Sequence, residues 1–203
     1  MLVGLAEQSG NFTNPSTEKE NWDFPKVVVL RWGHRYRDKR LTTHVALTAR
    51  ALGASGFILA DIEDFEIKAV VEKVVASFGG DFSFEMGLPW KKAVEKWRKE
   101  NGIVVHLTAY GENIATTDVL DRIKAQKKDV LVIVGSQKVP REFFSKEVSD
   151  FNVAVGNQPH SECSSLAVFL DRFFQGKELS KEFENAKLKI IGQARGKKVI
   201  EVK

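Results

Sequence analysis

The stretch VGNQPHSECSSLAVFLDR (residues 155–172) joins a loop of small and amide residues to an amphipathic helical pattern. The short apolar run at residues 151–155 leads into this loop, as expected for a buried strand. A plain turn needs fewer special residues than the loop contains, so the loop is a candidate ligand cradle. The stretch therefore predicts a strand, a binding loop and a helix in direct succession.

The same alternation of apolar runs and helical patterns is found along most of the chain. It predicts an α/β fold with a mostly parallel sheet and helices on both faces. We expect strands at residues 27–30, 57–60, 82–84, 103–107, 130–134 and 151–155. We expect helices at residues 45–53, with an N-cap at Thr42 or Thr43, and at residues 64–77, 89–99, 118–125 and 161–174, with one more opened by Pro140.

Composition divides the chain into three parts. Residues 1–26 are polar with little periodicity, which predicts a flexible N-terminal extension. Residues 27–178 carry the α/β pattern and predict the main domain. In the tail, residues 179–203, apolar segments at 187–191 and 198–202 predict a C-terminal β-hairpin appendage.

The overall composition excludes several classes of protein. The 203 residues are 43% hydrophobic and 29% charged, as in an ordinary globular protein. No apolar run approaches about 18 residues, so neither a membrane span nor a membrane partner is expected. Cys163 is the only cysteine, which excludes an internal disulfide and favours a reducing, cytoplasmic location.

The sequence lacks the familiar motifs of several kinds of site. The glycine motifs of dinucleotide and nucleoside triphosphate sites are absent. The four histidines do not have the spacing of a zinc-binding helix, so no metal site is expected. The net charge of +4 permits a polyanionic partner but does not require one.

Ligands of parallel α/β sheets bind beyond the carboxyl ends of the strands, so the loops after residues 107, 134 and 155 form the candidate site. Two of these loops are similar: VIVGSQKVP and VAVGNQPHSE both leave a strand through Val-Gly and enter an amide-rich turn. Glycine allows close approach to the backbone, and amides supply donors and acceptors. Alternatively, these residues only turn the chain, and Ser161 and Glu162 fit a helix N-terminus. The repetition of the pattern favours a binding site.

The loop RWGHRYRDKR (residues 31–40) carries five cationic side chains against one acid, with Trp32 and Tyr36 among them. Arginine contacts phosphates and aromatic rings stack on unpaired bases, so the loop predicts RNA binding. The alternative is a solvated cluster of surface charges. The candidate RNA-binding residues are Arg35, Arg37, Lys39 and Arg40.

Several long motifs, taken in order, resemble one known family. VVLRWGHRYRDKRLTTHVALTARALGA, VHLTAYG, VIVGSQKVP and NVAVGNQPHSECSSLAVFLDR closely resemble segments of the archaeal tRNA (cytidine-56) 2′-O-methyltransferases, which belong to the SPOUT class. The resemblance runs from about residue 27 to the end of the chain and includes QARGKKVIEV, whereas residues 1–26 lie outside it. Gln137 stands where some members of the family have glutamate.

The resemblance implies a fold and an activity that composition does not indicate. It implies a homodimer of SPOUT methyltransferase domains, each with a C-terminal trefoil knot. The implied activity is S-adenosyl-L-methionine-dependent 2′-O-methylation of a tRNA ribose, at cytidine 56 of the T-loop. Arg31, Arg35 and His34 are the candidates for activating the 2′-hydroxyl. The implied cofactor-binding residues are Leu107, Gly135, Ser136, Gln137, Lys138, Val139, Val155, Gly156, Asn157, Gln158, Pro159, His160, Ser161 and Glu162.

Three other functions are compatible with parts of the sequence. A methyltransferase of the same class would look alike if it acted on another RNA site, since no residue by itself specifies position 56. A non-catalytic RNA-binding module would retain the fold without binding the cofactor. A nucleotide-binding oxidoreductase is disfavoured because the glycine fingerprint is absent.

Overall fold

A six-stranded sheet forms the centre of the computed structural model, which describes residues 22–136 and 138–202. Every pair of neighbouring strands in this sheet is parallel, so the predicted α/β fold is confirmed. In sheet order the strands are β3 (Ser83–Met86), β2 (Gly56–Leu59), β1 (Val27–Arg31), β5 (Val130–Val134), β4 (Ile103–Asn113) and β6 (Phe151–Ala154).

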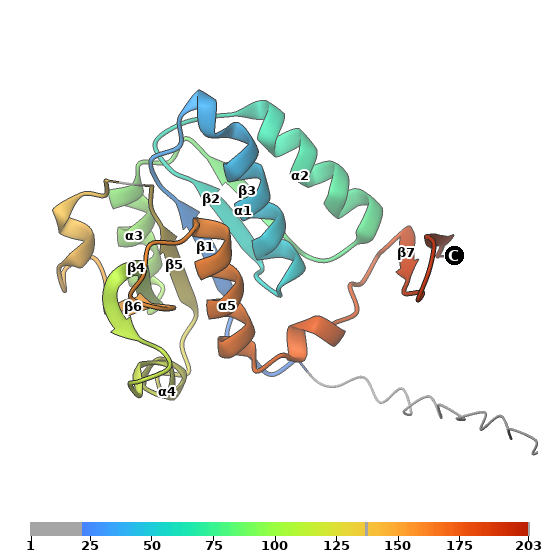
Figure 1. Ribbon diagram of the computed structural model, residues 1–203. Helices are drawn as coiled ribbons and strands as arrows, with labels where there is room; N and C mark the ends of the chain where they lie inside the picture. Colours follow the sequence, from blue (N-terminus) through green and yellow to red (C-terminus); the bar gives the residue numbers. More distant parts are fainter. Residues whose placement is uncertain (1–21, 137, 203) are drawn as a thin grey trace, which may run out of the picture.

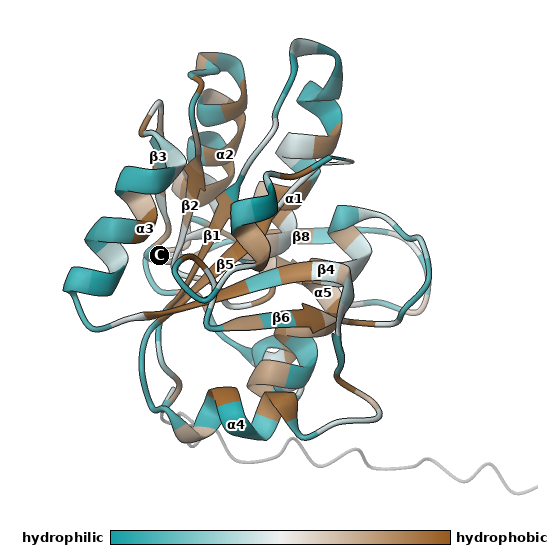
Figure 2. Cartoon of the chain, turned by 90° about the vertical axis from the view of Figure 1, so that its left-hand side faces the viewer, coloured by the Kyte–Doolittle hydropathy of each residue, from teal (hydrophilic) through white to brown (hydrophobic). Residues whose placement is uncertain are grey.

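Helices cover both faces of the sheet (Figure 1). One face carries α1 (Lys39–Ala51), α2 (Phe65–Phe78), α4 (Val119–Ala125) and α5 (Glu162–Phe174). The other face carries α3 (Trp90–Lys99) and the 3₁₀ turn η2 (Arg141–Phe144). Because both faces are covered, every residue of β2 and β5 is buried, and these strands read as continuous apolar runs. Figure 2 shows this apolar centre and the more polar outer surfaces of the helices.

Three predicted boundaries are wrong. No α-helix follows Pro140, because the single turn of η2 buries Phe143 and the backbone becomes extended at Ser145. Helix α1 begins at Lys39, so Thr42 is not an N-cap but a buried helical residue. Strand β4 does not end at residue 107 but continues through a bulge to Asn113.

The start of the described chain packs against helix α5. The rings of Trp22 and Phe24 pack against Phe174 of α5, so part of the predicted extension 1–26 contacts the core. The rest of that prediction falls on residues 1–21, which lie outside the described residues.

After η3 (Lys177–Ser180), β7 (Leu188–Ile191) and β8 (Lys198–Glu201) form a separate antiparallel pair. Among the described residues, no helix is long and apolar enough to cross a membrane.

Candidate functional site

A cavity of about 490 Å³ opens at the carboxyl ends of β1, β4, β5 and β6. This is the edge at which parallel α/β sheets bind ligands. The cavity brings together all three predicted loops and the start of α5. The predicted cofactor residues that line it are Leu107, Gly135, Ser136, Val139, Val155, Pro159, His160 and Glu162.

The described residues among the other predicted cofactor residues do not line this cavity. Lys138 lines a neighbouring hollow together with Trp32 and His34. Gln137 lies outside the described residues. Gly156, Asn157, Gln158 and Ser161 belong to the same loop as the lining residues Val155 and Pro159.

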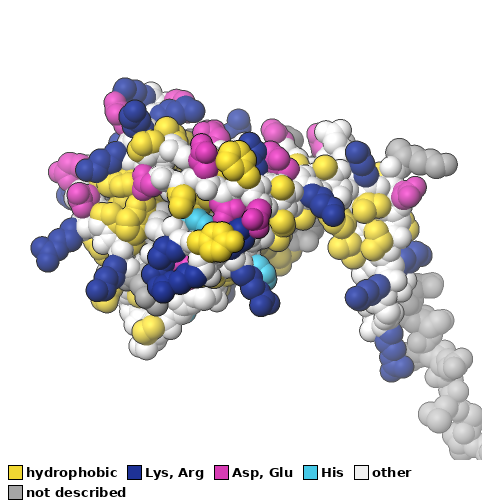
Figure 3. All heavy atoms as spheres, turned by 90° about the horizontal axis from the view of Figure 1, so that it is seen from above, with side chains coloured by type: hydrophobic (Ala, Val, Ile, Leu, Met, Phe, Trp, Pro, Cys, Tyr) yellow, Lys and Arg dark blue, Asp and Glu magenta, His cyan; other side chains and the backbone are white. Residues whose placement is uncertain are grey.

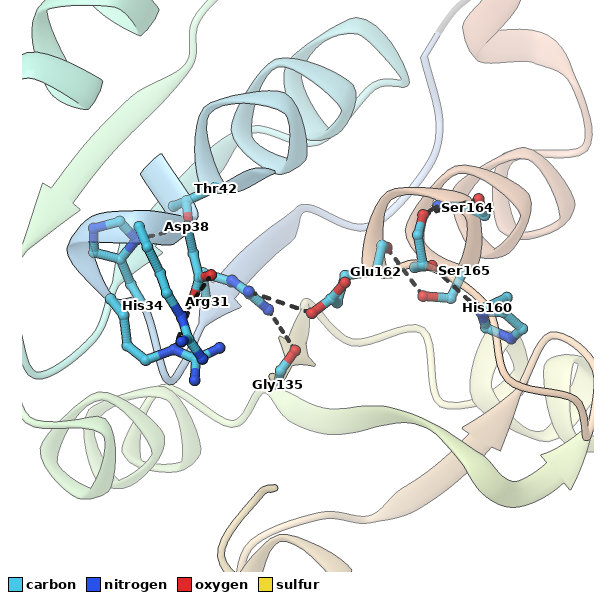
Figure 4. A network of polar contacts seen from close by, with 12 residues as sticks. Arg31, His34, Asp38, Thr42, Gly135, His160, Glu162, Ser164 and Ser165 are labelled. Carbon is cyan, nitrogen blue, oxygen red and sulfur yellow. Dashed lines mark hydrogen bonds and ion pairs between the residues drawn. The ribbon is translucent and has the colours of Figure 1, made fainter. Parts of the chain in front are cut away.

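Arg31 lies at the centre of the site, at the end of β1 (Figure 4). Its side chain is fully buried, and its Nη1 donates a hydrogen bond to the carbonyl of Gly135. Its Nη2 lies 3.4 Å from Oε1 of Glu162, in the first turn of α5. Burial lowers the pKa of the Arg31 guanidinium below its ordinary value, and the Glu162 carboxylate opposes this shift. Arg31 therefore joins the loop after β5 to the loop that precedes α5.

The guanidinium of Arg31 has hydrogen-bonding capacity left over. Its Nε is buried and has no hydrogen-bond partner among the described residues. A buried donor without a partner is energetically costly, so a further acceptor would stabilise this nitrogen.

Arg35 and His34 occupy different environments from Arg31. Arg35 lines the same cavity but is exposed, with its Nε 2.7 Å from Oδ2 of Asp38. His34 is buried on the other side of Arg31 (Figure 4), with Nδ1 hydrogen-bonded to Thr42 Oγ1 at 2.8 Å. Its Nε2 lies 3.4 Å from Oδ2 of Asp64. Both ring nitrogens of His34 therefore have partners, and its role in catalysis stays a prediction.

The Asn157 side chain ties two of the site loops together. Its Nδ2 donates to the carbonyls of Ala109, at 2.9 Å, and Gly111, at 3.1 Å. Its Oδ1 accepts a hydrogen bond from Asn113 Nδ2 at 3.0 Å. The role of Asn157 as a ligand contact stays a prediction, while its side chain holds the end of β4 against the loop before α5.

The two Val-Gly glycines differ in the space around them. A Cβ added at Gly135 would lie 2.1 Å from Cγ1 of Val139, which is far inside van der Waals contact. A Cβ added at Gly156 would have no neighbouring atom within 4 Å. Gly135 is therefore required by the packing of the protein itself, while the space at Gly156 is open.

The basic loop 31–40 lies at the same edge of the sheet as the cavity. Figure 3, which views that edge from above, shows Lys and Arg side chains beside exposed hydrophobic ones. Arg37 is exposed, and its Nε lies 3.9 Å from Asp38, which is a loose ion pair. Arg40 is exposed and has no ion pair among the described residues. Lys39 is held internally by Glu66, at 2.7 Å. Arg37 and Arg40 are thus the most available of the four predicted RNA-binding residues.

Three aromatic side chains line the cavity without being among the predicted cofactor residues, those of His106, Tyr110 and Phe144. Phe144 comes from η2, in a segment predicted to be a helix. Tyr110 lies in the bulged part of β4, between Leu107 and Glu112. Tyr110 follows residue 107 in the motif VHLTAYG, so it belongs to one of the three predicted site loops.

Two buried histidines predict a pH dependence of stability. Burial lowers the pKa of His34 and of His106 from the ordinary value of about 6.5, although Asp64 and Asn152 respectively oppose the shift. The unfolded chain therefore binds protons that the folded chain excludes, so stability present above about pH 6.5 is lost as the pH falls toward the folded values. We expect the thermal unfolding midpoint to decrease as the pH is lowered from 7 to 5.

The variant His106→Gln is expected to reduce this dependence, because it removes one of the two buried imidazoles. His44→Gln, at an exposed position of α1, is the matched control and should leave the dependence unchanged. A midpoint that stays constant from pH 7 to pH 5 in the parent protein would contradict the expectation.

Comparison with solved structures identifies the class of this fold. The SpoU methyltransferase AviRb from Streptomyces viridochromogenes, in complex with AdoMet, superposes with a TM-score of 0.54 at 13% identity. The match covers 77% of this chain and 59% of that one. The parallel sheet thus has the fold of the SpoU methyltransferases.

The sequence places the chain within one family of that class. A family model described as tRNA ribose 2′-O-methyltransferase, aTrm56, matches residues 78–200, and the chain belongs to this family. A tRNA (cytidine(56)-2′-O)-methyltransferase of Thermococcus kodakarensis is 56% identical over 180 residues, or 87% of this chain and 97% of that one. The protein of the same name from Staphylothermus marinus is 53% identical over 175 residues, or 86% and 92%. The resemblance stated from the motifs is confirmed.

Proposed function

We propose that this protein methylates the ribose 2′-hydroxyl of cytidine 56 in the T-loop of tRNA, with S-adenosyl-L-methionine as the methyl donor. The observation that carries the proposal is the buried Arg31, joined to a glycine loop and to Glu162 in a cavity at the carboxyl edge of the sheet. The names of the relatives that are 53–56% identical support tRNA as the substrate and cytidine 56 as the position.

The residues of the cavity fit the cofactor. S-adenosyl-L-methionine, when bound, supplies an electrophilic methyl group on a sulfonium. Leu107 and Val155 offer apolar walls for an adenosyl group. The two separate loops that contain Gly135 and Gly156 expose backbone groups. The carboxylate of Glu162, side-chain exposure 25%, is available to a cationic or donor-rich group.

Arg31 has the position needed to act on the 2′-hydroxyl. A guanidinium stays protonated in a protein, so Arg31 would orient the hydroxyl and stabilise developing negative charge. The proton would pass to water or to a phosphate oxygen. Arg35, exposed at the rim of the same cavity, is suited to bind a phosphate and is the alternative candidate.

The path of the chain supports the proposal of a C-terminal trefoil knot. Strand β6 lies at the edge of the sheet beside β4, yet α5, which follows β6, packs against α1. The connection between them runs past the loops after β4 and β5, and Asn157 is hydrogen-bonded within it to the end of β4. Protein chains rarely thread one segment through another, so such a path requires specific contacts of this kind.

We further infer a homodimer and a cytoplasmic location. Leu166, Phe169 and Phe173 of α5 are buried in the core, whereas Val168 is 40% exposed on the outer side and available to a second copy. Sedimentation equilibrium would test the dimer. The single cysteine, Cys163, agrees with a reducing compartment.

The decisive experiment is methylation of unmodified tRNA in the presence of labelled S-adenosyl-L-methionine, followed by mapping of the labelled nucleotide. The proposal predicts one 2′-O-methyl group, at cytidine 56. Label at another nucleotide would show that the protein is a methyltransferase of the same class with a different target nucleotide. Absence of both transfer and cofactor binding, measured by calorimetry, would favour the RNA-binding module.

The affinity for tRNA is expected to depend on Arg37 and Arg40. Each phosphate contact releases counterions, so binding should weaken as salt rises. The double variant Arg37→Ala with Arg40→Ala should flatten the log–log salt slope by about one to two units, if each arginine contacts one phosphate. Filter binding over a salt series measures this slope.

Lys73→Ala is the control for this measurement, because Lys73 is exposed on α2, away from the cavity. It should keep the parental slope. If the arginine double variant also keeps that slope, these arginines are solvated surface charges.

A further inference from the structure

The proposed function assigns no role to the aromatic side of the cavity. Tyr110 and Phe144 both line it, and the Tyr110 side chain is 89% exposed. No other large hydrophobic side chain of the described residues is as exposed. The phenol hydroxyl has no hydrogen-bond partner among the described residues. A large ring left this open beside a binding cavity is typical of a recognition surface.

The Tyr110 ring stands on a fixed base. Its centroid lies 6.5 Å from that of Phe144, with the ring planes at 62°, and Phe144 lies 5.0 Å from the His106 ring. His106 is buried and its Nδ1 is hydrogen-bonded to Asn152 Oδ1 at 2.9 Å. These contacts continue from the core to the surface, so the aromatic wall beside Tyr110 is anchored in the core.

The backbone beside Tyr110 is also held in place. The Tyr110 N–H donates to Thr108 Oγ1 at 3.3 Å. A Cβ added at the next residue, Gly111, would lie 2.5 Å from the backbone of Asn152, so only glycine allows this close approach. The carbonyl of Gly111 accepts a hydrogen bond from Asn157. The bulged part of β4 therefore holds the Tyr110 backbone in place beside the cavity.

The charges around the cavity favour a nucleic acid as the occupant. Arg31 and Arg35 line the same cavity as Tyr110, paired there with Glu162 and Asp38, and Lys138 lines the neighbouring hollow. The exposed Arg40 of the loop 31–40 has no ion pair among the described residues. Cations that bind phosphates together with an exposed ring that stacks on a base are the combination that recognises unpaired RNA.

We propose that Tyr110 stacks on the base of the nucleotide that receives the methyl group. This proposal rests on the proposed function, because it takes the target ribose to lie in the cavity that Arg31 lines. The base is attached to that same ribose, so a ring on the wall of the same cavity is within its reach. Stacking there holds the target nucleotide unpaired, with its 2′-hydroxyl toward Arg31.

The experiment uses the full chain and tRNA transcripts with a fluorescent cytosine analogue, quenched by stacking, at the target position. Tyr110→Ala should weaken tRNA binding by about 5- to 30-fold, within the range that one stacked base contributes. It should also abolish the quenching, while the cofactor affinity measured by calorimetry stays within about twofold. Tyr110→Phe and Tyr110→Trp should retain quenching, because the ring and not the hydroxyl makes the contact.

Phe65→Ala is the matched control, since Phe65 is 68% exposed on α2 and does not line the cavity. It should leave tRNA binding and quenching unchanged. Unchanged quenching in Tyr110→Ala overturns the proposal. Loss of cofactor affinity in that variant assigns the ring to the cofactor instead, and a changed sedimentation coefficient assigns it to contact with a second copy. If the parent protein methylates a different nucleotide, the cytidine 56 assignment fails, and the analogue is moved to the nucleotide that is methylated.

Discussion

Replacing Arg31 with alanine is expected to reduce the single-turnover rate of methyl transfer by about 10²–10⁴-fold, the range for a positioned acid–base group. The expectation follows from its fully buried guanidinium, held between the Gly135 carbonyl and Glu162 on the cavity wall. Arg31→Lys should recover little activity, because an ammonium lacks the planar fork that reaches both partners. Rapid-quench kinetics at saturating tRNA and cofactor measure the effect.

The same contacts give Arg31 a second, structural role that the controls must separate. Arg31→Ala leaves the Glu162 carboxylate without its partner, so the loop before α5 is also disturbed. Glu162→Gln breaks the ion pair but retains the guanidinium, and it should lose much less activity than Arg31→Ala. Equal losses in these two variants, accompanied by equal losses of cofactor affinity, would make Arg31 a loop-positioning residue.

Arg35→Ala tests the alternative assignment. Arg35 is exposed and paired only with Asp38, so its loss should weaken tRNA binding and leave the saturated rate within about tenfold of the parent. A larger loss at saturation from Arg35→Ala than from Arg31→Ala would reverse the two roles.

The apolar runs of the sequence predicted the sheet well, for a physical reason. Strands covered by helices on both sides, such as β5 at Val130–Val134, contain no polar position, and few other structures give this pattern. Local signals failed where tertiary contacts decided the outcome. After Pro140, burial of Phe143 against the second face of the sheet ended the helical turn within four residues. The sequence predicted Thr42 as an N-cap, whereas its buried hydroxyl is hydrogen-bonded to His34.

The candidate site was predictable in its loops but not in its internal contacts. Parallel strands end at one edge of a sheet, so the residues after Leu107, Val134 and Val155 had to lie close together. The sequence could not show which of these side chains face the cavity. Asn157 is directed at the carbonyls of the neighbouring loop, and Tyr110 became a lining residue because β4 continues through its bulge. Both outcomes depend on contacts between segments more than 40 residues apart.

The two similar glycines are expected to respond differently to substitution. Gly135→Val forces atoms against Val139, which lies 2.1 Å from the added Cβ, and the overpacking should cost about 1–3 kcal/mol of stability. It also displaces the carbonyl that Arg31 binds, so both the unfolding midpoint and the cofactor affinity should fall. Gly156→Val meets no atom within 4 Å and should leave the free energy of unfolding within about 0.5 kcal/mol of the parent.

Because the protein leaves the space at Gly156 open, a folded Gly156→Val variant reports whether the cofactor fills that space. We expect its affinity for S-adenosyl-L-methionine to fall at least tenfold, about 1.4 kcal/mol, since the valine side chain would block approach to the backbone. Calorimetric titration gives the affinity, and a thermal melt of the same sample confirms folding. Gly192→Val is the matched control, as that glycine also has open space around it but lies beyond β7, outside the cavity. Parental affinity in Gly156→Val would confine the cofactor to the cavity that Leu107 and Gly135 line, away from Gly156.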